Sequence, residues 1–306
     1  MPEGAPAARE RPKVLYVMGA GRSGSTVFGI ALGNCPDVFY AGELDAWLAR
    51  DGVPQIEDDP ERQAFWAGVR EETERGTDAL PGLYGITAQR AIERSLAVLR
   101  PQLWRTRRRL LPAYRAVAGA LYGAVARQSG APFIVDTSHY PLRARALQPV
   151  DTVELYLLYL RRDPRSVAAS FRRTDVAQYS KSTLTTNVYL WLTSLLSVLV
   201  YCRQPSNRRM TVRYEDFVAR PDAVVRDVLE LAGASPDRLP DFSSLAAGLP
   251  FQGNRVMRRA TVSLDGGLAR ALPRWTVTRL LQAPLAAVHA LLRPVAGMSG
   301  EPAAKR

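Results

Sequence analysis

Residues that build disulfides and metal sites are scarce in this chain. Cysteine occurs twice among 306 residues, at Cys35 and Cys202, and histidine occurs only as His139 and His289. Two cysteines provide neither a disulfide framework nor a cysteine-based zinc site, so we expect a reducing, cytoplasmic location. With two histidines a histidine-rich metal site is equally unexpected, and the sequence predicts no metal at the functional site.

Lysine is also nearly absent, although the chain is strongly basic. It occurs only at positions 13, 181 and 305, so arginine supplies almost all of the positive charge behind a formal net charge of +12. Guanidinium groups match phosphate and sulfate oxygens with paired hydrogen bonds, so this bias suits a polyanionic ligand. No recognisable nucleic-acid-binding module is present, and we expect no nucleic-acid partner.

Long apolar runs are rare as well. Residues 1–12 lack the apolar core of a signal peptide, and we expect disordered tails at 1–12 and 294–306. The run 182–202 carries no charge, but its length is marginal for a membrane span and Thr, Ser and Asn residues dilute it. It predicts a buried helix, and peripheral membrane association is open but not indicated.

Strand-like runs alternate with helical patterns along the rest of the chain. Short β-favouring runs occur at 14–18, 38–41, 132–138, 155–160 and 209–214. The alternation predicts an α/β fold in which a parallel sheet is flanked by helices, as a single domain over 13–293. A helical block from about 45 to 130 interrupts the alternation. It predicts an insertion that covers the substrate side of the sheet.

A glycine-rich turn follows the first predicted strand. Such a turn presents backbone N–H groups and a helix N-terminus to one point, a geometry that binds phosphate or sulfate. The spacing from Gly19 to Gly24 is that of a Walker loop, but Ser25 stands where that motif has lysine. The positive charge lies inside the loop instead, at Arg22. The loop therefore predicts an anion site that differs from a standard nucleoside triphosphate site.

A second polar block follows the strand predicted at 155–160. Arg162 ends that strand, and Ser170 lies eight residues further on, in a helix for which Asp163 and Pro164 provide the start. A strand end, a turn and the first helical turns can bring a guanidinium and a hydroxyl to the same anion. The block therefore predicts a second anion contact.

Both blocks together resemble the sulfotransferases that use 3′-phosphoadenosine 5′-phosphosulfate (PAPS). The run 22–26 resembles their 5′-phosphosulfate loop, and Arg162 and Ser170 match the arginine and serine of their 3′-phosphate block. The block 135–143 is similar to a strand end of bacterial members, although these usually carry lysine where this chain has His139. The resemblance implies a P-loop-like sulfotransferase fold.

Two further blocks extend the resemblance. Tyr214 lies in a Tyr-Glu-Asp block whose tyrosine contacts adenine in the family, and the run 253–258 resembles a late Gly-Asn loop whose basic residues reach the 3′-phosphate. The histidine that usually precedes this loop is absent, and Phe251-Gln252 stands there. The donor-site residues that the resemblance implies are Arg22, Ser23, Gly24, Ser25, Thr26, Arg162, Ser170, Tyr214, Gly253, Asn254, Arg255 and Arg258.

The resemblance also implies a reaction. A sulfuryl group would pass in line from PAPS to a hydroxyl or amine of a small-molecule, carbohydrate or lipid acceptor. No metal is needed, because arginines, hydroxyls and backbone N–H groups neutralise the charge. Arg22 would contact the bridging and leaving oxygens, and residues 23–26 would surround the 5′-phosphate.

Two residues are candidates for the base that takes the acceptor's proton. Glu43 lies in a Gly-Glu block similar to that of tyrosylprotein-type and bacterial sulfotransferases, where a glutamate is the base. His139 lies at a strand end, near the part of the fold where cytosolic aryl and steroid sulfotransferases use a histidine. We favour Glu43 and keep His139 as the alternative.

Two other classes of protein stay open. A small-molecule kinase of the P-loop class would share the glycine-rich loop, but the missing lysine and the block at 162–170 disfavour it. A non-catalytic nucleotide- or polyanion-binding protein would share the arginines, and it would tolerate alanine at Glu43 and at His139. The motifs specify neither the acceptor nor the oligomeric state, since acceptor choice depends on the helical block and on loops.

Overall fold

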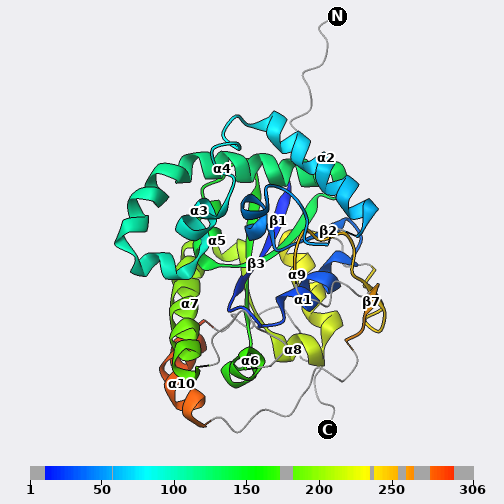
Figure 1. Cartoon of the computed structure of the whole chain (residues 1–306). Coiled ribbons are helices and arrows are strands. Elements are labelled where there is room, and N and C mark those ends of the chain that lie inside the picture. The colour runs from blue at the N-terminus through cyan, green and yellow to red at the C-terminus, as the bar shows by residue number, and fades with distance from the viewer. Residues whose placement is uncertain are drawn as a thin grey trace, which may run out of the picture.

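Five parallel strands form the central sheet of this computed structural model, which describes residues 11–56, 58–172, 182–234, 238–253, 260–264 and 276–292 (Figure 1). The strands are β1 (Lys13–Gly19), β2 (Val38–Gly42), β3 (Phe133–His139), β4 (Glu154–Arg161) and β5 (Arg209–Arg213). Their order in the sheet is β2-β3-β1-β4-β5, and all four neighbouring pairs run parallel. A short antiparallel pair, β6 (Leu245–Ala246) and β7 (Thr261–Val262), lies apart from this sheet.

The central strand β1 is buried on both sides. Val14, Tyr16 and Met18 belong to one apolar core, and Leu15 and Val17 belong to the other. None of the five side chains is exposed to solvent. A strand in the middle of a parallel sheet is covered by helices on both faces, which explains its nearly continuous apolar sequence. The predicted parallel α/β sheet is confirmed.

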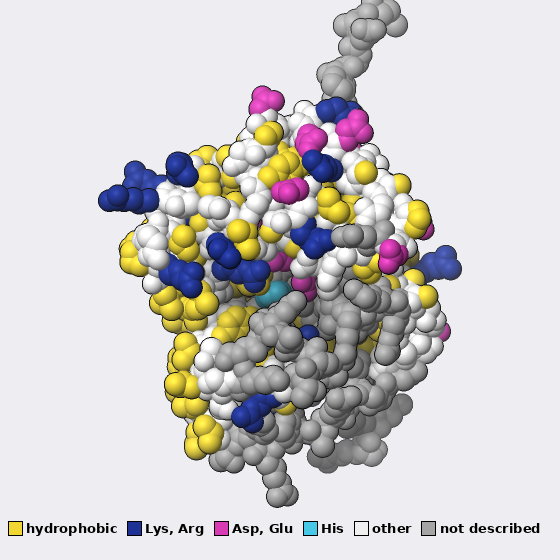
Figure 2. Space-filling view, viewed as in Figure 1, with side chains coloured by type: hydrophobic (Ala, Val, Ile, Leu, Met, Phe, Trp, Pro, Cys, Tyr) yellow, Lys and Arg dark blue, Asp and Glu magenta, His cyan; other side chains and the backbone are white. Residues whose placement is uncertain are grey.

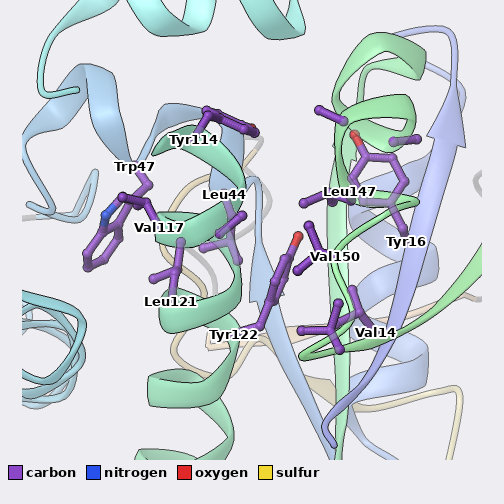
Figure 3. Packing of buried hydrophobic residues seen from close by; sticks show 14 of the residues in the cluster. Val14, Tyr16, Leu44, Trp47, Tyr114, Val117, Leu121, Tyr122, Leu147 and Val150 are labelled. Atoms are coloured by element: carbon purple, nitrogen blue, oxygen red, sulfur yellow. The ribbon is translucent and has the colours of Figure 1, made fainter. Parts of the chain in front are cut away.

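Helices from different parts of the chain cover the two faces. On the face of Leu15 and Val17 lie α1 (Ser25–Gly33), α8 (Tyr214–Ala219) and α9 (Pro221–Ala232). On the face of Tyr16 lie α4 (Pro101–Ser129), α5 (Pro141–Leu147) and the end of α7 (Thr183–Arg203). Figure 3 shows this second core, with Tyr122 of α4 between that helix and the sheet, Leu121 on the side of Trp47, and Leu147 of α5 beside Tyr16. The helix α6 (Pro164–Phe171) follows β4, and α10 (Thr276–Leu291) packs against α6 and α7.

The predicted helical block between 45 and 130 is helical in the structure, but not uniformly. The regular helices are α2 (Pro60–Gly76), the single turn α3 (Ile86–Ala88) and α4. Between α3 and α4 the chain forms a π-helical turn (Gln89–Glu93) and a 3-10 segment (Ser95–Leu99), and the block begins with two 3-10 turns (Leu44–Ala46 and Leu48–Arg50). Polar side chains of these turns are buried, among them Gln89, Glu93 and Ser95.

The helix predicted at 182–202 forms as α7, but it is buried on only one face. Asn187, Leu190 and Ser197 are buried, whereas Leu184 and Val188 are exposed. The prediction of a buried helix is therefore confirmed for one face of α7 and wrong for the face that carries Leu184 and Val188. By length and composition α7 could cross a membrane, a property that it shares with core helices of soluble proteins.

A buried ionic cluster joins the helical block to the sheet. The guanidinium of Arg143 on α5 lies 2.7 Å from a carboxylate oxygen of Glu93 and 3.2 Å from one of Asp136 on β3. It also donates hydrogen bonds to the hydroxyl groups of Tyr114 and Tyr122 on α4. All of these side chains are buried. The cluster therefore ties β3, α4, α5 and the π-helical turn together.

We predict that Arg143→Met destabilises the fold by about 3–5 kcal/mol, because it leaves two carboxylates buried without their cation. The measurement is the free energy of unfolding in urea. Arg145→Met is the matched control: Arg145 lies on the same short helix but is exposed, so its loss should change stability by at most about 0.5 kcal/mol. Equal stabilities of the two variants would contradict the prediction.

Candidate active site

The candidate residues follow the carboxyl ends of different strands. Arg22 follows β1, Glu43 follows β2, His139 ends β3, Arg162 follows β4, and Tyr214 follows β5. In a parallel sheet all carboxyl ends lie at one edge, so residues from distant parts of the sequence gather there. The helix after β1 leads toward β2 and the helix after β3 leads toward β4, on opposite faces of the sheet. The crevice expected at such a reversal lies between β1 and β3, beside Arg22 and His139.

The glycine-rich loop turns tightly between β1 and α1. Gly24 has a left-handed backbone, with a φ of 94°, and a Cβ atom there would lie 2.2 Å from the ring of Tyr214. Only glycine fits this position. No side chain caps the first turn of α1, and Ser23, Ser25 and Thr26 are buried around it. The N-terminus of α1 is therefore directed at the loop, as an anion site requires.

The two sequence blocks around Arg22 and Arg162 meet in space. The Nε atom of Arg22 donates a hydrogen bond of 3.0 Å to the hydroxyl of Ser170 on α6. The guanidinium of Arg162 donates one of 3.2 Å to the backbone carbonyl of Arg22. The same guanidinium lies over the ring of Tyr214, 4.4 Å from its centroid. Four of the predicted donor-site residues thus form one cluster around the loop.

A cavity of about 250 Å³ lies beside this cluster, between the end of β4, α6, α7 and α10. Ser23 of the loop contributes to its wall, together with Arg161, Arg162 and Arg213. Apolar side chains such as Leu190 complete it. Asp163 and Glu215 also line the cavity, so three arginines stand against two acidic residues and leave a small excess of positive charge for an anionic group.

Of the predicted late loop at 253–258, Gly253 lies within the described residues. Gly253 donates a backbone hydrogen bond to the side chain of Gln55, and Asn254, Arg255 and Arg258 lie outside the described residues. Before Gly253 the chain runs along the end of β2, where the backbone N–H of Glu43 donates a hydrogen bond of 2.7 Å to the carbonyl of Gln252. The segment therefore contacts the candidate base from β2.

Glu43 is half-buried at the end of β2. Burial, reinforced by the nearby carboxylate of Asp45, raises the pKa of Glu43 to about 8. A hydrogen bond from the side chain of Gln252 and the positive charge of Arg94 oppose this rise. A carboxylate with such a pKa is a much stronger base than an exposed glutamate.

His139 lies beside the glycine-rich loop. Its backbone is left-handed, with a φ of 56°, and its Nε2 atom is 3.6 Å from the point where a Cβ atom of Gly21 would lie. Burial, together with the charge of Arg94, lowers the pKa of His139 to about 4. The imidazole is therefore neutral at pH 7. Its Nδ1 atom is buried and has no hydrogen-bond partner within the described part of the chain.

Three residues that the sequence did not reveal lie around the candidate bases. Arg94 influences the pKa of both Glu43 and His139, and its guanidinium lies over the ring of Tyr140. Tyr189 of α7 accepts a hydrogen bond of 2.9 Å from the backbone N–H of Gly21. Asp45 shares the buried surroundings of Glu43. Within the described ranges, no three His, Cys, Asp or Glu side chains are placed to hold a metal ion.

Comparison with known proteins points to one family. A family model described as "Sulfotransferase family" matches residues 13–237, well over half of the chain. No curated protein matches the chain. Among solved structures, the sulfotransferase domain from the olefin synthase of Synechococcus PCC 7002 is 16% identical with a TM-score of 0.52, and the match covers 94% of this chain and 98% of that domain.

A second solved structure, sulfotransferase STF9 from Mycobacterium avium, is 15% identical with a TM-score of 0.49. That match covers 92% of this chain and 77% of the other. At these identities the likeness to solved structures concerns the fold alone.

The loop geometry predicts that Gly24→Ala destabilises the protein more than Gly130→Ala does. Both glycines are left-handed, so alanine costs about 1–2 kcal/mol at either position. Only at Gly24 does the added methyl group also collide with Tyr214, whereas nothing lies within 4 Å at Gly130. The extra cost should be about 1–3 kcal/mol, measured as the difference between the unfolding free energies of the two variants. A difference of zero would refute the close contact between loop and ring.

Proposed function

Because this chain belongs to the sulfotransferase family, we propose that it transfers a sulfuryl group from PAPS to a hydroxyl or amine group of a small-molecule, carbohydrate or lipid acceptor. The observation that carries the proposal is the cluster of Arg22, Ser170 and Arg162 beside the N-terminus of α1. A ligand with two separate phosphate groups needs two anion contacts in one site. The loop and the strand-end arginine supply one each.

We assign the 5′-phosphosulfate to the glycine-rich loop. The backbone N–H groups at 23–26 and the buried hydroxyls of Ser25 and Thr26 would surround it at the start of α1. Arg162 and Ser170 would hold the 3′-phosphate, with Tyr214 beside the adenine. Since Arg22 and Ser170 are hydrogen-bonded, both ends of the donor would be held by side chains that already contact one another.

The chemistry of the transfer then depends on charge and alignment. Negative charge builds up on the leaving phosphate oxygens as the sulfur–oxygen bond of PAPS breaks and a new bond forms to the acceptor oxygen or nitrogen. Guanidinium and backbone N–H groups that are fixed in advance stabilise this charge without reorganisation. Arg22, which lies within the loop, would contact the bridging oxygen.

Glu43 is the base that this site supports best. Its raised pKa of about 8 makes it able to take a proton from a hydroxyl group in the transition state. His139, with its pKa lowered to about 4, is a weak base that would instead accept a hydrogen bond in its neutral form. Both groups lie near Asp136 and Arg94, so they would face the same acceptor.

The donor site predicts tight binding of adenosine 3′,5′-bisphosphate in calorimetric titration, with EDTA present. Arg22→Ala and Arg162→Ala should each weaken binding at least roughly tenfold, since a charge-assisted hydrogen bond contributes about 1.5–3 kcal/mol. Arg165→Ala is the matched control, because Arg165 lies on the same segment but is paired with Asp163 at 2.8 Å. Binding of ATP that requires magnesium and exceeds binding of the bisphosphate would favour a kinase instead.

The base assignment predicts a pH profile. For any acceptor that the protein sulfates, kcat/KM should rise with pH up to about 8 and then level off, because only deprotonated Glu43 accepts the proton. Glu43→Gln should lower kcat/KM by about 100-fold or more, and His139→Gln should lower it much less. A profile that is already level above pH 5, together with the larger loss in His139→Gln, would make His139 the base.

A further inference from the structure

The helix α7 buries polar as well as apolar side chains and leaves an apolar stripe exposed. The side chains that it buries include Asn187, Thr193 and Ser197, whereas Leu184 is 68% exposed. Val188, Leu195 and Leu199 are also exposed and follow Leu184 at helical spacing, so they form one stripe. A helix in contact with water normally buries its apolar stripe and exposes its polar one. An exposed apolar stripe of this length is typical of a helix whose outer face is covered by a partner or by a membrane surface.

The helix α10 packs on α7 through polar side chains. Its buried Thr278 and Gln282 both hydrogen-bond Asn187 of α7, which makes the contact between the two helices polar. Outside this contact Leu280 is 68% exposed, and Val277 and Leu281 are exposed beside it. Two neighbouring helices thus meet through polar groups and each leaves apolar side chains exposed, although Leu190 of α7 and Leu285 of α10 are buried.

The exposed apolar surface continues onto the helical block. The 3-10 segment Ser95–Leu99 contacts both α7 and α4, and Leu96, Leu99 and Trp104 are exposed there. We call the whole surface the apolar face. Figure 2 shows hydrophobic side chains along the left edge of the molecule, where Figure 1 places α7 and α10. Its members are Leu96, Leu99, Trp104, Leu184, Val188, Leu195, Leu199, Val277, Leu280 and Leu281.

The segments that form the apolar face carry charge of one sign. The segments 94–129, 182–203 and 276–292, which form this face, contain no Asp or Glu. The exposed charged residues of these segments are arginines, and Figure 2 shows basic side chains gathered above the upper end of the apolar face. They include Arg100, Arg105, Arg108, Arg109, Arg203 and Arg279.

We propose that the apolar face docks on the surface of an anionic lipid bilayer. Leucines and a tryptophan would enter the headgroup region, and the arginines around them would meet the negative headgroups. Membrane binding by apolar burial and by basic charge together is stable where either alone is marginal. A second copy of the chain is a poorer occupant, because a two-fold contact would bring the acid-free, arginine-rich segments of both copies together.

This docking would hold the candidate active site close to the bilayer. The helix that carries the exposed Val188 also carries Tyr189, whose hydroxyl accepts the hydrogen bond from Gly21 of the glycine-rich loop. One helix thus separates the loop from the bilayer surface. The proposal does not depend on the reaction that the site performs.

The test is co-sedimentation of the full chain with lipid vesicles. Vesicles of phosphatidylcholine with phosphatidylglycerol should bind the protein at low salt, vesicles of phosphatidylcholine alone should bind much less, and added salt should weaken binding. The double variant Leu184→Glu/Leu195→Glu should lose binding roughly tenfold or more, since it places two acidic groups on the apolar face. Val53→Glu is the control, an exposed apolar residue of the loop after Arg50, and should bind like the parent.

A second variant keeps the test decisive if the double variant does not fold. Arg105→Ser/Arg108→Ser changes only exposed residues of α4 and should weaken binding to the anionic vesicles without changing the thermal unfolding midpoint. Failure of the parent chain to bind anionic vesicles would overturn the proposal. So would a dimer, measured by light scattering, that Leu184→Glu/Leu195→Glu converts to monomers, because the apolar face would then be covered by a second copy.

Discussion

The parallel alignment of the five strands is the constraint on which the rest of the molecule depends. Because every strand points the same way, Arg22, Glu43, His139, Arg162 and Tyr214 all emerge at one edge of the sheet although nearly 200 residues of sequence separate the first from the last. Hydrogen bonds between neighbouring strands fix the spacing of the strands. Residues that directly follow the strands are therefore held at fixed positions relative to one another. The site is in this sense a property of the sheet.

The helical block adds charge to that edge. Through the π-helical turn and the segment after it, Glu93 and Arg94 enter the surroundings of β3, where Glu93 pairs with Arg143 and Arg94 acts on the two candidate bases. Burial then pulls the pKa values of Glu43 and His139 in opposite directions, because it disfavours the charged form of each. Arg94, which lies in the helical block and not at a strand end, thus adjusts the basicity of Glu43 and His139, which lie at the ends of β2 and β3.

The sequence predicted the parts of the fold that depend on local pattern. The apolar run before Gly19, the glycine loop and the strand end at Arg162 are readable because neighbouring residues decide them. The contact of Tyr189 with Gly21 and the influence of Arg94 were not readable, since each joins positions far apart in sequence. The run 182–202 misled for another reason: several of its polar residues, such as Asn187 and Ser197, face the protein, while an apolar stripe with Leu184 and Val188 is exposed. The roles proposed for Arg255 and Arg258 remain predictions, because both lie outside the described residues.

The central claim is that Arg22 and Arg162 hold the two ends of one nucleotide donor. A crystal structure of the complex with adenosine 3′,5′-bisphosphate tests it most directly. The account predicts the 5′-phosphate at the N-terminus of α1, within hydrogen-bond reach of the backbone at 23–26, and the 3′-phosphate between Arg162 and Ser170. A nucleotide bound elsewhere, or one with its phosphates away from both arginines, would contradict it.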